Sequence, residues 1–193
     1  MSIPTRRRTV RRGAVAAAAA TGLALVLAGC VGAPAATPTP SPAGTPAPIF
    51  ASDEEALAAA TEAYEAYSST INAIARDGNQ EAERIRAVVT EEYAPDVESL
   101  FSDLATRGLS IRGDSHVDSI RLVEFATVDD AAEVTILLCS DVTESRIVDA
   151  AGNDVTPATR PNRSALQAVL VSSLNDPAAL LVDKEDPWSG DYC

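Results

Sequence analysis

The sequence predicts an α+β domain over residues 51–193, with helices first and an antiparallel sheet after them. Between Leu57 and Ile74, apolar residues recur at steps of three and four, which is the period of an α-helix. After Gly108 the period changes to two, which is typical of strands with one face against a core. Helices followed by strands in this order favour an α+β fold.

The first helix is expected to begin at Ser52 and to run to about Arg76. Ser52 and Glu55 have the spacing of a capping box, and Gly78-Asn79 suits the end of a helix. One stripe of this helix would carry Leu57, Ala60, Tyr64, Tyr67, Ile71 and Ile74. Such a stripe also fits a coiled coil, but alanines and tyrosines in the seam favour packing within one chain.

Two shorter helices are expected before the sheet. The second covers Gln80 to Glu91, and the third starts near Pro95, whose missing amide costs nothing in a first turn, and stops at Arg107-Gly108. Their apolar sides are expected to consist of Ile85, Val88 and Val89 in the second helix and of Val97, Leu100, Phe101 and Leu104 in the third.

Five strands are expected in the second half of the chain. Asp129-Asp130 and Gly152-Asn153 suit turns between them. The strands cover His116–Phe125, Ala132–Cys139, Arg146–Val148, Ser164–Ser172 and Leu180–Asp183.

Two cysteines of the domain, Cys139 and Cys193, are candidates for a disulfide. It would close a loop of about 55 residues, add about 4 kcal/mol on the chain-entropy model and hold the tail from Pro187 onward. Two free buried thiols or a metal site are the alternatives. A metal site is disfavoured because no His or further Cys lies near either residue.

The N-terminal segment has the pattern of an export signal, and Leu27-Ala28-Gly29-Cys30 resembles the lipobox of bacterial lipoproteins. Five arginines precede an apolar run from Ala14 to Ala28 that, at about 15 residues, is too short for a permanent span. We therefore expect residues 1–29 to be a signal peptide and Cys30 to be lipidated. An ordinary secretory signal with an incidental cysteine is the alternative, and the choice between general and twin-arginine export stays open.

Residues 30–50 are expected to be a linker. This segment contains six prolines and no charge, a composition that favours extended polyproline II over a packed core. Fully extended, it would reach about 60 Å. Its hydroxyl residues Thr37, Thr39, Ser41 and Thr45 are either spacer residues or O-glycosylation sites.

The charge of the chain limits its partners. Without the five arginines before Cys30, ten basic and 28 acidic residues remain, a formal charge of −18. Nucleic acid and anionic headgroups would be repelled, so the membrane contact is expected to depend on the lipid at Cys30. A single lysine, Lys184, with many arginines and alanines suggests a GC-rich genome and favours an actinobacterial source.

The chain is similar to actinobacterial lipoproteins with a nuclear-transport-factor-2-like (cystatin-like, cone-shaped) domain, over about residues 51–193. Besides the long first helix, the similarity rests on Leu104-Ala105-Thr106-Arg107-Gly108-Leu109, Gly113-Asp114, Cys139-Ser140-Asp141, Ile147-Val148-Asp149-Ala150-Ala151-Gly152-Asn153 and Trp188 to Cys193. It implies a curved sheet wrapped around helices with an apolar mouth. It implies no activity.

Candidate catalytic and metal-binding residues are few. His116 is the single histidine, and an enzyme would need it as a base paired with Asp114 or Asp118, although a surface position is the plainer interpretation. No nucleophile elbow, phosphate loop or Cys-x-x-Cys motif is present in the sequence. The acids of 149–154 and 183–186 lack EF-hand spacing and favour solvated turns over a Ca²⁺ site. We therefore expect no catalytic residue, no metal and no cofactor.

The sequence favours a non-catalytic binding or interaction module, anchored by Cys30 to the outer, extracellular face of the cytoplasmic membrane. One alternative is an enzyme or carrier of a small apolar ligand that uses the interior of the cone, with His116 as base. Another is a subunit of an envelope transport or conjugation complex. In each case the protein partner or ligand is unidentified.

Overall fold

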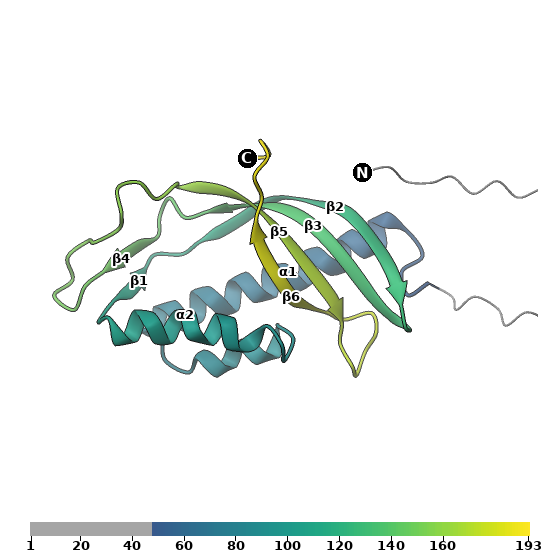
Figure 1. The fold of residues 1–193 in the computed structure, drawn as a ribbon, viewed down its shortest axis with the longest axis horizontal. Coiled ribbons are helices and arrows are strands. Elements are labelled where there is room, and N and C mark those ends of the chain that lie inside the picture. The colour runs from purple at the N-terminus through teal and green to yellow at the C-terminus, as the bar shows by residue number, and fades with distance from the viewer. Residues whose placement is uncertain (1–47) are drawn as a thin grey trace, which may run out of the picture. The chain divides into compact units, whose positions relative to one another are not determined.

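A computed structural model describes residues 48–193 (Figure 1). The predicted signal peptide, Cys30 and most of the predicted linker lie outside the described residues. The elements are α1 (Asp53–Arg76), the 3-10 helix η1 (Ala82–Ala87), α2 (Ala94–Thr106), β1 (Ser110–Arg112), β2 (His116–Val128), β3 (Ala131–Asp141), β4 (Arg146–Val148), β5 (Arg163–Ser172) and β6 (Leu180–Pro187). Helices followed by a curved antiparallel sheet confirm the predicted α+β class.

The ends of α1 agree with the prediction. The Ser52 hydroxyl accepts a hydrogen bond from the amide of Glu55 at 3.3 Å, and the carboxylate of Glu55 accepts one from the amide of Ala51 at 2.7 Å. These two bonds satisfy amides that the helix itself leaves free. At the other end Asn79 has a φ of 64°, and its amide bonds the carbonyl of Ile74 at 3.0 Å.

The predicted second helix is wrong in kind. Glu81 has a φ of 54°, which no α-helix tolerates, and only the six residues of η1 are helical. After η1 the chain extends and pairs beside β6: the amide of Thr90 bonds the carbonyl of Val182 at 3.0 Å, and the amide of Val182 bonds the carbonyl of Val88 at 3.1 Å. This segment covers part of the β6 edge.

α2 begins as predicted, with Pro95 in its first turn. Val97, Phe101 and Leu104 are buried, but Leu100 is 52% exposed and was wrongly assigned to the apolar side. The other predicted apolar residues of the helical region are buried or half-buried, including Ile85 and Val89.

The four-stranded sheet has the order β2-β3-β5-β6, with antiparallel neighbours throughout. Irregular pairing interrupts β2 at two places and β6 at one, and Ser119 within the first has a φ of 54°. Such bulges bend and twist a sheet. Asp129 and Asp130 both have positive φ values, 50° and 64°, as a tight hairpin turn requires.

A second, two-stranded sheet forms an arm that extends from the main sheet (Figure 1). β1 was not predicted, because three residues are too few to show a period. It pairs with β4, with Ile111 opposite Ile147.

The core lies between the helices and one face of the four-stranded sheet. Phe50 is 2% exposed and meets Phe125 edge to face, with ring centroids 6.4 Å apart. The packed part therefore includes the last residues of the predicted linker. Fully buried residues at the centre are Ala60, Ile74, Ile85, Phe101, Val134, Ile136, Leu138, Ala168, Leu170 and Val182.

The C-terminal tail runs back from β6 toward β2. The amide of Trp188 bonds the carbonyl of Ala165 on β5 at 2.9 Å, and Cys193 forms the expected disulfide with Cys139 on β3. Tyr192 donates a hydrogen bond to the carbonyl of Ser119 on β2. The disulfide thus fixes the end of the chain on the strand at the middle of the sheet.

Candidate functional site

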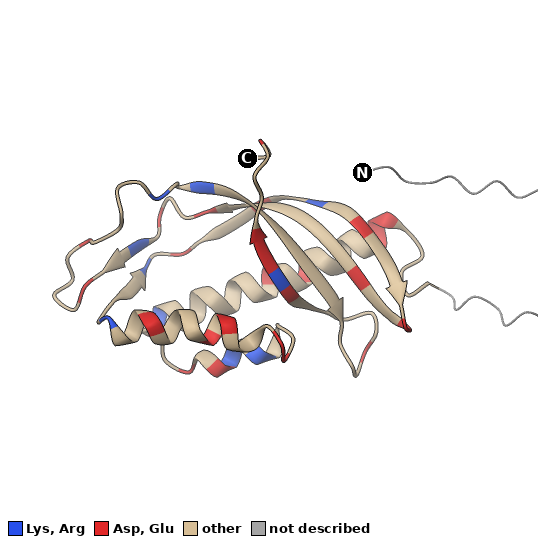
Figure 2. Ribbon diagram, viewed as in Figure 1, with Lys and Arg blue, Asp and Glu red and all other residues tan. Residues whose placement is uncertain are grey.

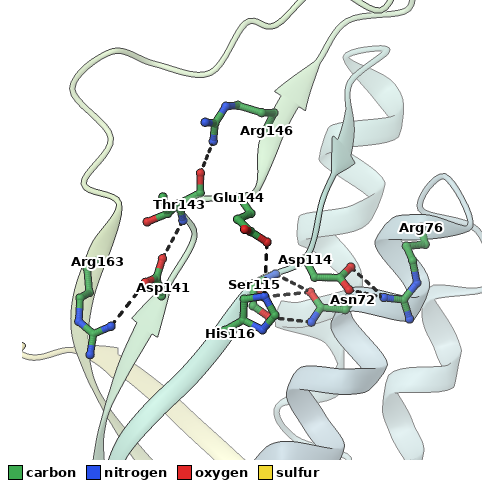
Figure 3. Close-up of polar contacts among 10 residues, drawn as sticks. All are labelled: Asn72, Arg76, Asp114, Ser115, His116, Asp141, Thr143, Glu144, Arg146 and Arg163. Carbon is green, nitrogen blue, oxygen red and sulfur yellow. Dashed lines mark hydrogen bonds and ion pairs between the residues drawn. The ribbon is translucent and has the colours of Figure 1, made fainter.

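His116 lies on the surface where the arm leaves the main sheet (Figure 3). Its side chain is 63% exposed, and its Nε2 atom lies 3.9 Å from a carboxylate oxygen of Glu144, itself 78% exposed. Both groups are open to solvent. The pair therefore lacks the enclosed surroundings that make a histidine an effective base.

His116 lies on the surface, as the plainer interpretation held, and the aspartate pairing that an enzyme would need is not formed. Asp114 receives two hydrogen bonds from Arg76, at 2.8 and 2.9 Å, which tie the start of β2 to α1. Asp118 binds Arg163 on β5 and the hydroxyl of Ser119. Hydrogen bonds from Arg163 hold the pKa of Asp118 below its ordinary value.

The polar residues around His116 fasten elements together. The Asn72 amide group on α1 donates to the carbonyl of Ser115 at 2.8 Å and accepts from the Ser115 amide at 3.0 Å (Figure 3). Asp141 accepts from the amide of Thr143 at 2.8 Å and closes the turn after β3. This cluster links α1, β2 and the β3–β4 connection by polar contacts, so its role is structural.

At the edge of the core lies a half-buried polar group that the sequence reasoning missed. Glu185 on β6 accepts a hydrogen bond from the hydroxyl of Tyr64, and Tyr67 and Tyr93 lie close to the same carboxylate. Burial raises the pKa of Glu185 above its ordinary value. Burial, followed by the nearby Glu185 charge, also raises the pKa of Tyr64 and Tyr67.

The two tyrosines of α1 in this cluster are core residues. Tyr64 is 2% exposed and Tyr67 is 7% exposed, and their rings meet edge to face at 5.5 Å. Trp188 lies in the tail and is 43% exposed.

Two open grooves lie beside the loop that joins β5 to β6. The first, of about 550 Å³, runs between α1 and this loop, with Ala59, Ala63 and Leu180 among its walls. The second, of about 560 Å³, lies on the other side of Ala87 and includes Val89. The grooves adjoin, because Ala87, Ser173 and Leu181 line both.

At the tip of the same loop, Leu174 is 100% exposed. A single exposed apolar residue is common, but this one lines the second groove, which adjoins a first groove with mostly apolar walls. No sequence signal marked it, because a leucine between Ser173 and Asn175 has no periodic context. We call the loop Ser173–Ala179 with its two grooves the Leu174 surface.

In the acidic loop after β4, the carboxylate of Asp149 is hydrogen-bonded within the loop itself. Asp149 accepts hydrogen bonds from the amides of Ala151 and Asn153, both at 2.9 Å, and from the Asn153 side chain at 3.0 Å. These bonds lower its pKa. Within residues 48–193, no three His, Cys, Asp or Glu residues are grouped so as to hold a metal ion.

Comparison with known proteins bears on the fold. No protein-family model matches the chain, and no curated protein matches it significantly in sequence. Among solved structures, the chain is similar to the intermembrane space region of the chloroplast protein ARC6, with a TM-score of 0.51 and 12% identity. The match covers 69% of this chain and 97% of that chain. At this identity the likeness supports a shared α+β fold and carries no function.

Proposed function

We propose that the protein is a cell-envelope lipoprotein whose domain binds a partner without catalysing a reaction. The observation that carries the binding role is the Leu174 surface, where an exposed leucine lies beside two adjoining grooves, one with mostly apolar walls and one with mixed walls. We also assign the domain to the cone-shaped, nuclear-transport-factor-2-like group. The curved antiparallel sheet with a long first helix supports that assignment.

The enzyme hypothesis that the sequence left open has lost its main support. It required His116 inside a cavity with a carboxylate partner, and His116 and Glu144 are both largely exposed. The carrier hypothesis required an open interior, and the buried rings of Tyr64 and Tyr67 occupy the interior beside β6. A role as a subunit of a larger envelope complex is one form of the binding function.

Attachment through Cys30 is the second part of the proposal. Within residues 48–193 no helix is long and apolar enough to cross a membrane. Two or three acyl chains on one cysteine anchor a protein stably, whereas one chain holds it only marginally. We expect Cys30→Ser to move the protein from the membrane fraction to the soluble fraction, as measured by fractionation and immunoblotting. A variant that stays firmly in the membrane would contradict the anchor.

Crosslinking in intact cells, followed by purification from solubilised membranes, tests the binding function. The proposal expects the wild-type protein to capture the same partner in repeated preparations. Turnover of a small molecule that depends on His116 would contradict it. The turnover rate of His116→Ala is compared with that of Arg112→Ala, a control variant at an exposed residue nearby in the sequence.

A further inference from the structure

We propose that the Leu174 surface is the docking site for a positively charged amphipathic segment of a partner protein. The inference rests on the proposed binding function and makes it specific. It follows from three features of the surface: an apolar side chain held out into water, grooves that accept further apolar side chains, and carboxylates around them.

Leu174 is held in place by the loop that carries it. The Ser173 amide bonds the Ala179 carbonyl at 2.7 Å, and the hydroxyl of Ser172 donates to the carbonyl of Pro177 at 2.6 Å. Asp176 closes the turn by accepting from the amide of Ala178 at 3.0 Å. The leucine therefore projects from a closed, hydrogen-bonded loop, so a partner would meet a preformed apolar contact.

The grooves suit a chain with several apolar side chains. α1 lines the first groove with small residues, Ala59, Ala63 and Ala66, which leave room above the helix for larger side chains. Because the two grooves share Ala87 and Leu181, a segment lying across them would place apolar residues in both grooves and in contact with Leu174, which lines the second. An amphipathic helix binds in this way, with its apolar side in a groove.

The charges beside the grooves are mostly negative. Glu62 and Asp176 line the first groove, and Glu91, Glu92 and Asp183 line the second. The one basic residue among the lining residues is Arg86, which Glu98 neutralises with two hydrogen bonds of 2.6 and 2.9 Å. An occupant with lysines or arginines would meet complementary charge.

The same charges argue against the other occupants. A second copy of this domain, with 28 acidic and ten basic residues, would bring more negative charge to an acidic surface (Figure 2). Anionic lipid headgroups would be repelled for the same reason. The chemistry therefore favours a protein segment with an apolar side and a basic side.

The test measures binding of a synthetic probe to the mature chain that carries Cys30→Ser, which removes the need for detergent. The probe is a fluorescein-labelled 18-residue peptide of leucine and lysine with helical spacing of the leucines. Its counterpart has glutamate in place of each lysine. We expect the lysine peptide to bind at least about tenfold more tightly than its counterpart, as measured by fluorescence anisotropy.

Leu174→Ser should weaken binding of the lysine peptide by about tenfold or more, because one buried leucine is lost. Leu100→Ser, at an exposed leucine of α2 away from the grooves, should change binding less than twofold. Glu91→Gln with Glu92→Gln should weaken binding and reduce its salt dependence, whereas Asp129→Asn with Asp130→Asn should not. Equal effects of the two leucine variants, or equal binding of the two peptides, would overturn the proposal.

Vesicles of phosphatidylglycerol and phosphatidylcholine distinguish a lipid surface from a peptide. Binding of the chain to these vesicles that Leu174→Ser abolishes would overturn the protein-segment proposal in favour of lipid. The crosslinking experiment separates this inference from the proposed function. A partner captured equally by wild type and Leu174→Ser would leave the binding function standing and refute this surface as its site.

Discussion

Gly113 lies at the closest approach of two connections at the base of the arm. Its φ is +80°, and a β-carbon built on it would lie 2.1 Å from the backbone oxygen of Glu144. Both the backbone conformation and the lack of space require glycine here. Gly152, in the loop after β4, has a φ of +86° but nothing within 4 Å of the same position.

Comparing alanine variants of Gly113 and Gly152 separates the cost of a left-handed backbone from the cost of a steric clash. We expect Gly152→Ala to lower the free energy of unfolding by about 1–2 kcal/mol, the cost of a left-handed alanine. Gly113→Ala should cost more, because a backbone segment must also move. Urea denaturation of both variants measures the difference, and equal losses would contradict the close contact at Glu144.

Glu185 is a half-buried carboxylate that contacts the tyrosines of the core. Its pKa is raised from 4.5 mainly by burial, although the hydrogen bond from Tyr64 opposes the rise. The folded chain therefore binds the proton more tightly than the unfolded chain. It follows that this group favours folding most below pH 4.5 and that its contribution decreases as pH rises through the folded pKa.

Glu185→Gln tests this linkage, because glutamine has no proton to lose. We expect the free energy of unfolding of the variant, relative to wild type, to rise between pH 4 and pH 7. Urea denaturation at several pH values gives the comparison, and Glu133→Gln, at an exposed position, controls for the loss of one charge. A difference that is constant over this range would contradict a raised pKa of the half-buried Glu185.

The sequence alone located His116 correctly at a strand start but not its partner. Glu144 is distant in the sequence, and the two residues meet only because Gly113 lets the β3–β4 connection approach. Glu185 was missed for a related reason. It lies in a charged run that resembles a solvated turn, and β6 continues through it because Glu185 is paired in register with Ala168.

At the scale of elements, long periodic segments were predicted well and short ones were not. α1 has a clear stripe and strong end signals, so its bounds were predicted almost to the residue. The segment after it carries buried Ile85 and Val89 at a spacing that a helix and an extended chain both satisfy. Pairing with β6 decides between them, and that contact is invisible in the local sequence.

The C-terminal tail behaves as an added layer on the sheet. Arg121 of β2 is opposite Leu137 of β3, and the guanidinium of Arg121 lies 4.7 Å from the ring centroid of Tyr192. Leu137 is only 1% exposed, although it lies on the sheet face opposite the helices. The disulfide at Cys193 keeps this cover in place.

Cys193→Ser should release the tail and lower the free energy of unfolding by about 4 kcal/mol, since Cys139 and Cys193 close a loop with a separation of 54 residues. Trp188 is the one tryptophan of the chain, so its fluorescence reports on the tail. We expect a red shift in the variant and in wild type treated with dithiothreitol. An unchanged emission and an unchanged urea midpoint would contradict the structural role of the disulfide.

At the scale of the molecule, charge and attachment act together. The described domain is strongly acidic (Figure 2), so an anionic membrane surface would repel it. A lipid at Cys30 would nevertheless keep the chain attached to that membrane. This combination suits a module that stands away from the lipid and meets a basic partner. The fold class and the disulfide followed from the sequence, whereas the Leu174 surface depends on contacts between distant segments.

Mass spectrometry of the protein purified from membranes tests the central claim most directly. The account predicts a chain that begins at Cys30, with a diacylglyceryl group on its sulfur. A chain that begins at Met1 and has a free thiol at residue 30 would contradict the account.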